Sequence, residues 1–459
     1  MLFNSFLFLF VFLPSALASH WLVERFRPGW RLPLLALLSF VFYGYWDWRF
    51  IPLLMLSILI NWTLAQCFLK TRRGSLIVGA IALNLLTLGF FKYANFFSGI
   101  LPGLTLPSAD IFGMGSALPL GISFFTFHHI MYLADFRAGR APRFDLMRYA
   151  LYIAFFPQVL AGPLVRWSEI MHQFDERPYQ RSDAARRFSI GVMLLVMGLG
   201  KKVFLGDPLA SDVNPIFAAA ANGDAVSLVG AWQATLGFTF QIYFDFSGYT
   251  DMALGVALML GIVLPQNFRA PYLATSLSDF WRRWHMTLSR FLRDYLYIPL
   301  GGNRHGLPVQ FLALLATMTL GGLWHGAGLS FLAWGGLHGL GLCAGVVWRR
   351  AAPPMPAVCG WILTFAFVAF AWVLFRAPTF EAALRIYEAL IGLAPTGHGF
   401  KWRSIAAAAA VATIGPTAWE AAHKAPASRW VAVATAILFV AAVFKMGNDE
   451  NYEFIYFQF

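Results

Sequence analysis

Charged residues are scarce in this 459-residue chain: they make up 12% of it, whereas hydrophobic residues make up 59%. Soluble domains carry about 25% charged residues, so the composition excludes a soluble enzyme and a disordered chain. Cysteine is also scarce, which excludes a disulfide scaffold. The three cysteines, Cys67, Cys343 and Cys359, lie in or beside apolar segments without metal-ligand spacing, and we expect them to be buried bystanders.

The chain lacks the basic stretch that precedes the apolar core of a signal peptide, because its first apolar run, residues 2–19, begins at once. We therefore expect this run to be a retained membrane helix. No Gly/Ser-rich linker or compositional break divides the remainder. This predicts a single integral membrane domain over residues 1–459.

Apolar runs of roughly 18 to 25 residues recur along the chain, and each is long enough to cross a bilayer. They predict an all-α polytopic membrane protein with roughly 11–13 membrane helices, together with re-entrant or interfacial helices. The expected spans are residues 2–19, 32–48, 50–69, 75–98, 115–134, 188–205, 225–262 (a pair or one broken helix), 309–324, 328–348, 357–376, 404–420 and 428–446.

The formal net charge of +12 is assigned to cytoplasmic loops, where the positive-inside rule concentrates Lys and Arg. Nucleic-acid binding would need a soluble basic face, which the chain lacks. Basic clusters follow the first, third and fifth spans, and the loops between them carry almost no basic charge, so the N-terminus is predicted to lie outside. The clusters are Arg25, Arg27 and Arg31; Lys70, Arg72 and Arg73; and Arg137, Arg140, Arg143 and Arg148.

Two segments depart from this regular pattern. Residues 151–164 are apolar but too short to span and have basic flanks, which predicts a re-entrant segment wrapped in protein. Residues 264–306 are basic and aromatic and are predicted on the cytoplasmic face. The arginines there suit the phosphates of a cofactor or the acidic groups of a carrier protein. The alternative is an amphipathic interfacial helix that places Trp281, Trp284 and Phe291 at the lipid boundary.

His325 is the first candidate for acid–base chemistry. It lies in the glycine-rich sequence GGLWHGAG between apolar stretches, where an ionisable side chain tends to face the bundle interior or a wet cavity. Imidazole accepts and returns a proton near neutral pH, which suits a general base. The alternative is a helix-packing histidine among small neighbours.

His285 is the second candidate, in the basic stretch itself. Ser276, Ser278 and Asp279 suit the start of its helix, and Gly301, Gly302 and Asn303 suit a tight turn after it.

Other polar groups within the predicted spans have simpler interpretations. His128 and His129 suit either a cavity lining or neutral, hydrogen-bonded core positions. Asp245 and Asp251 are six positions apart and do not share a helix face, so a structural role is favoured over an acid/base dyad. A membrane di-iron enzyme would need several histidine clusters, so we predict neither a metal site nor a bound cofactor.

Five motifs together resemble the membrane-bound O-acyltransferase family, and within it the bacterial branch of alginate O-acetylation and teichoic acid D-alanylation proteins. They are SDFWRRWHMTLSRFLRDYLYIPLGGNR at 278–304, GGLWHGAG at 321–328, PLGISFFTFHHIMYLADFR at 119–137, FFPQVLAGPLVR at 155–166 and QIYFDFSGYTDMALG at 241–255. The resemblance implies helices surrounding a tunnel between the two faces, with His325 and His285 as the functional histidines. His128 departs from the glutamine expected in many relatives, so no role is transferred to it.

The resemblance and the residues together predict a membrane O-acetyltransferase. An acetyl thioester, either acetyl-CoA or an acetylated acyl carrier protein, would arrive at the cytoplasmic face. His325 would act as general base on an acceptor hydroxyl from the opposite face, and His285 would orient the donor or shuttle a proton. Candidate donor-binding and oxyanion-stabilising residues are Arg282, Arg283, Arg290, Asn303 and Trp324.

A periplasmic partner is expected to complete O-acetylation of an extracytoplasmic, alginate-like polysaccharide, which places the chain in a bacterial inner membrane. Two alternatives stay open. One is transfer of D-alanyl or another acyl group from a carrier protein, and the other is a membrane transporter without acyl chemistry.

Overall fold

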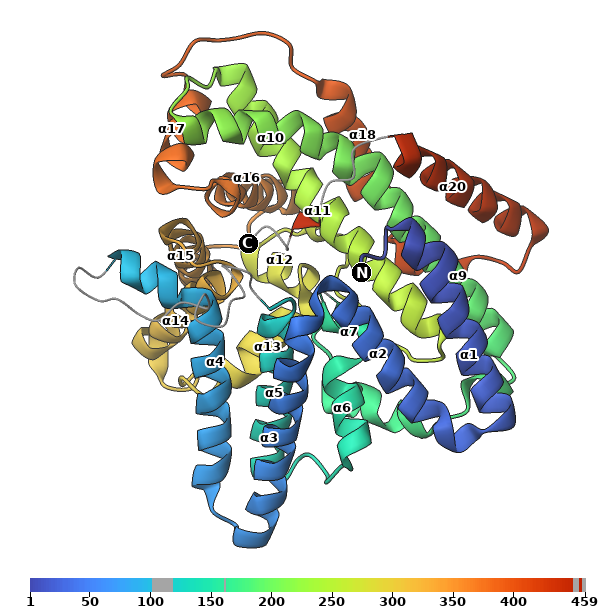
Figure 1. Ribbon diagram of the computed structural model, residues 1–459. Coiled ribbons are helices and arrows are strands. Elements are labelled where there is room, and N and C mark those ends of the chain that lie inside the picture. The colour runs from blue at the N-terminus through green and yellow to red at the C-terminus, as the bar shows by residue number, and fades with distance from the viewer. Residues whose placement is uncertain (101–118, 161, 449–453, 456–459) are drawn as a thin grey trace. The chain divides into compact units, whose positions relative to one another are not determined.

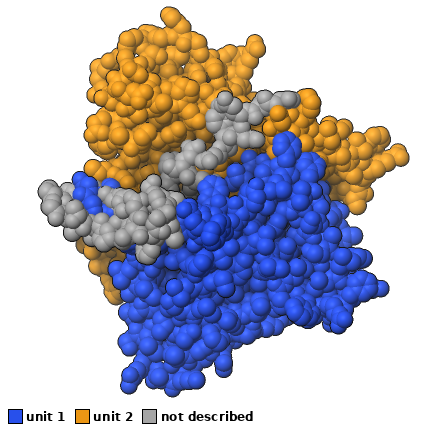
Figure 2. All heavy atoms as spheres, in the orientation of Figure 1, with its two compact units in different colours: residues 1–196, 250–265 blue, residues 197–249, 266–459 orange. Residues whose placement is uncertain are grey.

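The computed structural model describes residues 1–100, 119–160, 162–448 and 454–455, which contain helices and no β-strand (Figure 1). The chain forms two compact units, residues 1–196 with 250–265 (unit 1) and residues 197–249 with 266–459 (unit 2) (Figure 2). Neither unit is a continuous stretch, since the chain passes between them three times. The all-α prediction is confirmed, and the single domain stays a prediction.

Seven helical segments of the described residues are long and apolar enough to cross a membrane, or up to eight if a bent pair forms one span. The chain is therefore a multi-pass membrane protein. The other predicted spans form shorter or more polar helices, and residues 115–118 of one of them lie outside the described residues. The seven segments are Pro28–Thr71, Gly74–Ala94, Ala184–Asn222, Gly306–His325, Leu329–Ala351, Ala357–Arg376 and Arg429–Gly447.

Two sequence predictions about the helices need correction. Residues 225–262 were expected to form a pair or a broken helix, but α11 (Leu228–Met259) is one helix of 32 residues. The predicted span 404–420 is instead broken into α18 (Trp402–Thr413) and α19 (Ala418–Lys424), which are bent by 53°. Gly415 and Pro416 lie at this break, and proline cannot donate the backbone hydrogen bond that continues a helix.

The cysteine prediction was right at one position of three. Cys343 is buried, whereas Cys67 and Cys359 are exposed. Composition cannot separate these cases, because an outward-facing position on a membrane helix is as apolar as a core position.

Unit 1 holds the N-terminal helices. Asn61 of α3 and Asn84 of α4 exchange hydrogen bonds of 3.2 and 2.7 Å between their amides, which satisfies two polar side chains in an apolar region. The helices are a π-helix Phe8–Phe12, α1 (Leu13–Phe26), α2 (Arg31–Asp47), α3 (Ile51–Thr71), α4 (Gly74–Ile100), α5 (Ile122–Arg137), α6 (Leu146–Ala154), α7 (Phe156–Val159) and α8 (Trp167–Ile170), with parts of α9 (Ala184–Lys201) and α11.

The predicted re-entrant segment is broken between α6 and α7, and its residues 151–160 and 162–164 are buried in the protein, as expected. Other groups satisfy its irregular backbone. The Phe156 N–H donates to Ser39 Oγ (3.2 Å), and the N–H of Val165, just beyond the segment, donates to His128 Nε2 (3.2 Å). These bonds join the segment to α2 and α5 and pair one backbone group within it and one just beyond it, as a re-entrant segment would require.

His128 and His129 occupy structural positions. Because His128 Nε2 accepts from Val165, its Nδ1–H donates to the Phe124 carbonyl at 2.9 Å. His129 lies between the Tyr149 hydroxyl (2.7 Å) and Ser57 Oγ (3.3 Å). Both rings are fully buried and use both nitrogens, which supports the core interpretation over a cavity lining.

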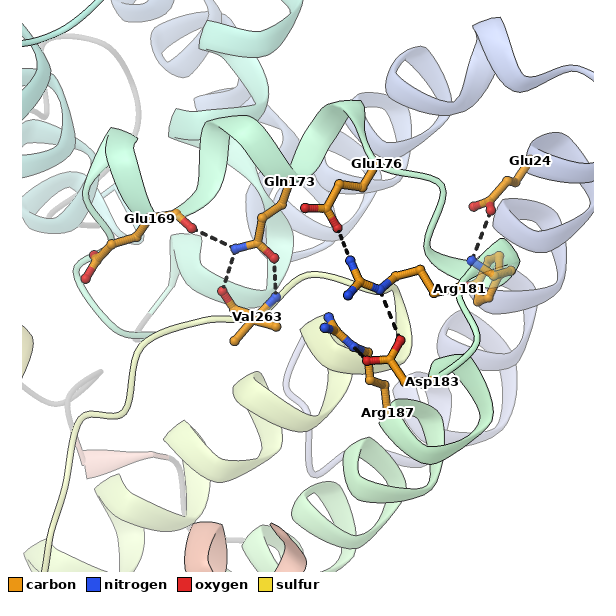
Figure 3. A network of polar contacts seen from close by, with 9 residues as sticks. Glu24, Glu169, Gln173, Glu176, Arg181, Asp183, Arg187 and Val263 are labelled. Carbon is orange, nitrogen blue, oxygen red and sulfur yellow. Dashed lines mark hydrogen bonds and ion pairs between the residues drawn. The ribbon is translucent and has the colours of Figure 1, made fainter.

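A polar network in unit 1 joins the segment after α8 to the stretch that follows α11 (Figure 3). The Gln173 amide exchanges two hydrogen bonds with the backbone of Val263, at 2.9 and 2.8 Å. Arg181 contacts Glu176 and Asp183, and Arg187 contacts Asp183. Hydrogen bonds from the two guanidinium groups lower the pKa of the Asp183 carboxyl, and the bond from Arg187 has the larger effect.

A surface pocket of about 470 Å³ is lined by Gln173, Glu176, Arg181, Arg187 and Val263 of this network, and both arginines are already paired with carboxylates. We therefore interpret the network as structural: its hydrogen bonds and ion pairs hold these segments together.

Unit 2 holds the remaining helices and a buried ion cluster. Lys202, which is 3% exposed, contacts Asp207 at 2.7 Å and Asp245 at 2.5 Å, and the Ile455 N–H donates to Asp245 at 2.7 Å. This pairing supports the structural interpretation of Asp245. The helices are a π-helix Lys202–Gly206, α10 (Asp207–Asn222), α12 (Leu277–Arg283), α13 (Met286–Leu292), a π-helix Arg293–Tyr297, α14 (Gly306–His325), α15 (Leu329–Ala351), α16 (Ala357–Arg376), α17 (Phe380–Leu390), α18, α19 and α20 (Arg429–Asn448).

Helices α14 and α15 of unit 2 lie side by side and touch through their glycines (Figure 1). A Cβ on Gly322 would lie 2.2 Å from the Phe331 carbonyl oxygen, and a Cβ on Gly335 would lie 2.3 Å from that of Met318. Only glycine allows this approach. The close contact brings α15 against the end of α14, where His325 lies.

Candidate functional site

The backbone around His285 is held in an unusual conformation. Helix α12 begins as predicted, with Ser276 Oγ accepting the Asp279 N–H at 3.2 Å, and it ends at Arg283. His285 then has φ 42° and ψ 53°, the left-handed region, before α13 begins. A non-glycine residue there costs about 1–3 kcal/mol, so its surroundings must hold it. The Met286 N–H donates to the Asn267 carbonyl at 2.9 Å and contributes to this.

The side chain of Asn267 fixes the orientation of the His285 ring. Its fully buried Oδ1 lies 3.2 Å from His285 Nδ1 and also accepts from the N–H and the hydroxyl of Thr287, at 3.2 and 2.9 Å. An amide oxygen only accepts, so His285 Nδ1 carries the proton. The lone pair of this fully buried imidazole is therefore at Nε2, the nitrogen suited to receive a proton.

His325 lies beside His285 in unit 2. It is the last residue of α14 and 7% exposed, and the centroids of the two imidazole rings are 6.4 Å apart. The Trp324 ring lies near both imidazoles, with ring centroids 4.8 Å from that of His325 and 6.3 Å from that of His285. The rings of Trp334 and Phe375 also pack against His325, with centroid distances of 5.4 and 5.2 Å. The two predicted histidines thus form one aromatic-walled cluster.

The predicted binding residues lie in different surroundings. Trp324 is buried against the histidines, whereas Asn303 is exposed in the predicted turn, where Gly301 and Gly302 have φ of 106° and 55°. Arg282 is exposed, Arg290 is half-buried, and Arg283 pairs with Asp279 at 3.0 Å. Of the five predicted binding residues, Trp324 is the one that contacts the histidine rings in the described contacts.

The interfacial alternative for this stretch was wrong about its aromatic residues. Trp281, Trp284 and Phe291 are 8%, 1% and 6% exposed, so they pack into the protein core of unit 2 and are not at a lipid boundary. Aromatic residues alternating with arginines fit either arrangement, and only packing distinguishes them.

Sequence reasoning did not single out two residues of this cluster. Asn267 lies 18 positions before His285 and follows no periodic pattern. His338 of α15 is fully buried and contacts Trp281 and Trp334, but in the sequence it is one polar residue in an apolar helix. In the described part of the chain, no three His, Cys, Asp or Glu side chains come together as metal ligands.

Residues 40–380 match the model of the MBOAT, membrane-bound O-acyltransferase family. The chain is 38% identical over 430 residues to the peptidoglycan O-acetyltransferase of Helicobacter pylori, an alignment covering 86% of this chain and 80% of the relative. It is 39% identical over 407 residues to the probable alginate O-acetylase AlgI of Pseudomonas aeruginosa, covering 85% and 75%. It is 26% identical over 331 residues to the teichoic acid D-alanyltransferase of Bacillus subtilis, covering 68% and 80%.

Proposed function

Since the chain belongs to the membrane-bound O-acyltransferase family and is an acyltransferase, we propose that it moves an acetyl group from a cytoplasmic thioester to a hydroxyl acceptor at the opposite face of a bacterial inner membrane. The observation that supports this most is the pair of buried imidazoles, 6.4 Å apart, at the position where the family motif predicts the reaction. The two relatives named as acetylating enzymes share 38% and 39% identity, against 26% for the D-alanyltransferase, which favours an acetyl group.

In the proposed reaction His325 takes the proton of the acceptor hydroxyl while its oxygen attacks the thioester carbonyl carbon. The resulting oxyanion collapses, the carbon–sulfur bond breaks, and the thiolate leaves with the proton that His325 returns. An ester and a free thiol result. The Trp324 indole N–H is the proposed donor to the oxyanion, because this side chain lies against His325 at 4.8 Å.

His285 is proposed to assist as a proton relay. Asn267 holds its Nδ1–H, so Nε2 accepts a proton without rotation of the ring. A protonated His285 beside the reacting groups would also stabilise negative charge on the oxyanion.

The charge of the basic stretch supports the proposed donor. Arg282, Arg283 and Arg290 are proposed to bind the phosphates of acetyl-CoA or the acidic surface of an acetylated carrier protein. An alginate-like polysaccharide is the proposed final acceptor. A periplasmic partner protein is proposed to accept the acetyl group and pass it to that polysaccharide.

The test is the O-acetyl content of the polysaccharide in cells that express His325→Ala or His285→Asn at matched membrane levels. Alanine at position 325 removes the base, and asparagine at position 285 retains a donor near the position of Nδ1 but no base. The polysaccharide should therefore lose most of its acetyl groups in cells with either variant. His398→Ala, at an exposed position, should retain them. Normal acetylation by His325→Ala would overturn its role as the base.

A second experiment separates the donors. Purified protein in vesicles is given the proposed acceptor, a periplasmic partner protein together with alginate. Acetyl-CoA, acetyl carrier protein or D-alanyl carrier protein is then added, and the thiol released is measured. Release from either acetyl donor supports the proposal. Release only from the D-alanyl carrier would overturn the acetyl assignment.

A further inference from the structure

A third buried histidine, His338, has a defined tautomer. The indole N–H of Trp281 donates to His338 Nδ1 at 3.3 Å. An indole nitrogen is a donor only, so His338 Nδ1 must be unprotonated. The neutral ring then carries its proton on Nε2.

This Nε2–H has no acceptor among the described residues, although His338 is fully buried. The cost of an unpaired N–H is largest inside a membrane protein, where bulk water does not reach it. Such a group in a reaction cluster is a candidate for binding a ligand that supplies a hydrogen-bond acceptor.

The position of His338 connects it to both candidate catalytic histidines. The Trp334 ring lies 4.8 Å from His338 and 5.4 Å from His325. Trp281, its hydrogen-bond partner, lies four positions before His285 in the same basic stretch. Because Trp334 contacts both histidines, a group bound at His338 would lie near the carbon that reacts beside His325.

We propose that His338 is a positioning residue for the acyl donor, and that its Nε2–H donates to an amide carbonyl oxygen in the donor's pantetheine arm. This inference rests on the proposed function, because a thioester of CoA or of a carrier protein carries that arm. The hydrogen bond holds the thioester against His325 while His338 itself takes no part in proton transfer.

Two conservative variants separate this role from a purely structural one. His338→Gln places its amide near the position of Nε2 and retains the donor, whereas His338→Asn places its amide near Nδ1 and retains the contact with Trp281. If His338 binds the donor, the Gln variant should stay within about threefold of the wild-type KM for acetyl-CoA. The Asn variant should raise KM about tenfold, the value of one hydrogen bond, with kcat nearly unchanged.

A purely structural role predicts that the Gln variant is impaired and the Asn variant is not. His338→Asn would then resemble the wild type, and His338→Gln would lower the unfolding temperature and the kcat without a specific change in KM. That result, or equal KM values in both variants, would overturn the proposal. Failure of the proposed function looks different, because the wild-type protein itself would then release no thiol from acetyl-CoA or from acetyl carrier protein.

Discussion

Replacement of Asn267 by leucine tests how the site holds His285. Leucine has a similar branched shape but no oxygen, so it removes the acceptor of three hydrogen bonds from His285 and Thr287. The Thr287 hydroxyl can rotate to another acceptor. The two N–H donors cannot, and each buried donor left unpaired costs about 1–3 kcal/mol. The free energy of unfolding should fall by about 2–6 kcal/mol.

The same change should lower acetyl transfer more than stability explains. Loss of a group that orients a functional imidazole lowers affinity or activity by about 10–100-fold in metal sites, and we expect a similar loss of turnover for Asn267→Leu. Thiol release from acetyl-CoA, measured on folded protein in vesicles, reports turnover, and tryptophan fluorescence during thermal unfolding reports stability.

The matched control is Asn267→Asp, which retains an oxygen for all three donors. It should fold and retain far more activity than Asn267→Leu. If Asn267→Leu turns over at the wild-type rate, the Asn267 oxygen does not orient His285 for catalysis, and the proton relay loses its structural basis.

Three further predictions concern the frame of the site. Gly335→Ala should push α15 away from α14, lower the free energy of unfolding by about 1–3 kcal/mol and reduce acetyl transfer. The control is Gly336→Ala, whose Cβ would meet only a hydroxyl at 3.8 Å and which should change neither stability nor transfer. Equal effects of the two substitutions would refute the close-contact argument. Lys202→Met should cost about 3–5 kcal/mol in thermal unfolding because it removes the cation that pairs with the buried Asp245 and the half-buried Asp207. Neutralising both aspartates as well should restore stability. His285→Gly and His285→Ala should both be inactive. The free energy of unfolding should be about 1 kcal/mol higher for the glycine variant, because a glycine backbone accepts φ 42° freely. Equal free energies of unfolding would mean that the loop relaxes.

The sequence supplied the helical class and both histidines because each has a local signal. Long apolar runs predict membrane helices, and an ionisable residue between glycine-rich apolar stretches is conspicuous. The boundaries were less accurate where a helix continues through polar residues, as α11 does past Asp245 and Asp251. Such residues look like a break in composition but are accommodated by buried partners such as Lys202.

The partners of the histidines could not be predicted. Asn267 reaches His285 only because the chain turns through a left-handed residue and pairs 267 with 286, a conformation that no residue pattern indicates. His338 reaches Trp281 only because α15 packs against α12, two helices far apart in the sequence. Both contacts depend on backbone geometry, whereas periodicity reports only which face of an element is apolar.

The aromatic wall around His325 also bears on the permeability of the membrane to ions. Protons cross a protein along files of water and hydrogen-bonding groups, and rings such as Trp334 and Phe375 leave little room for such a file beside the imidazole. Because Asn267 holds the Nδ1–H of His285, that ring offers a single nitrogen, Nε2, to a proton passing along the cluster. An energised membrane that contains this protein should therefore keep its proton gradient while the site is empty.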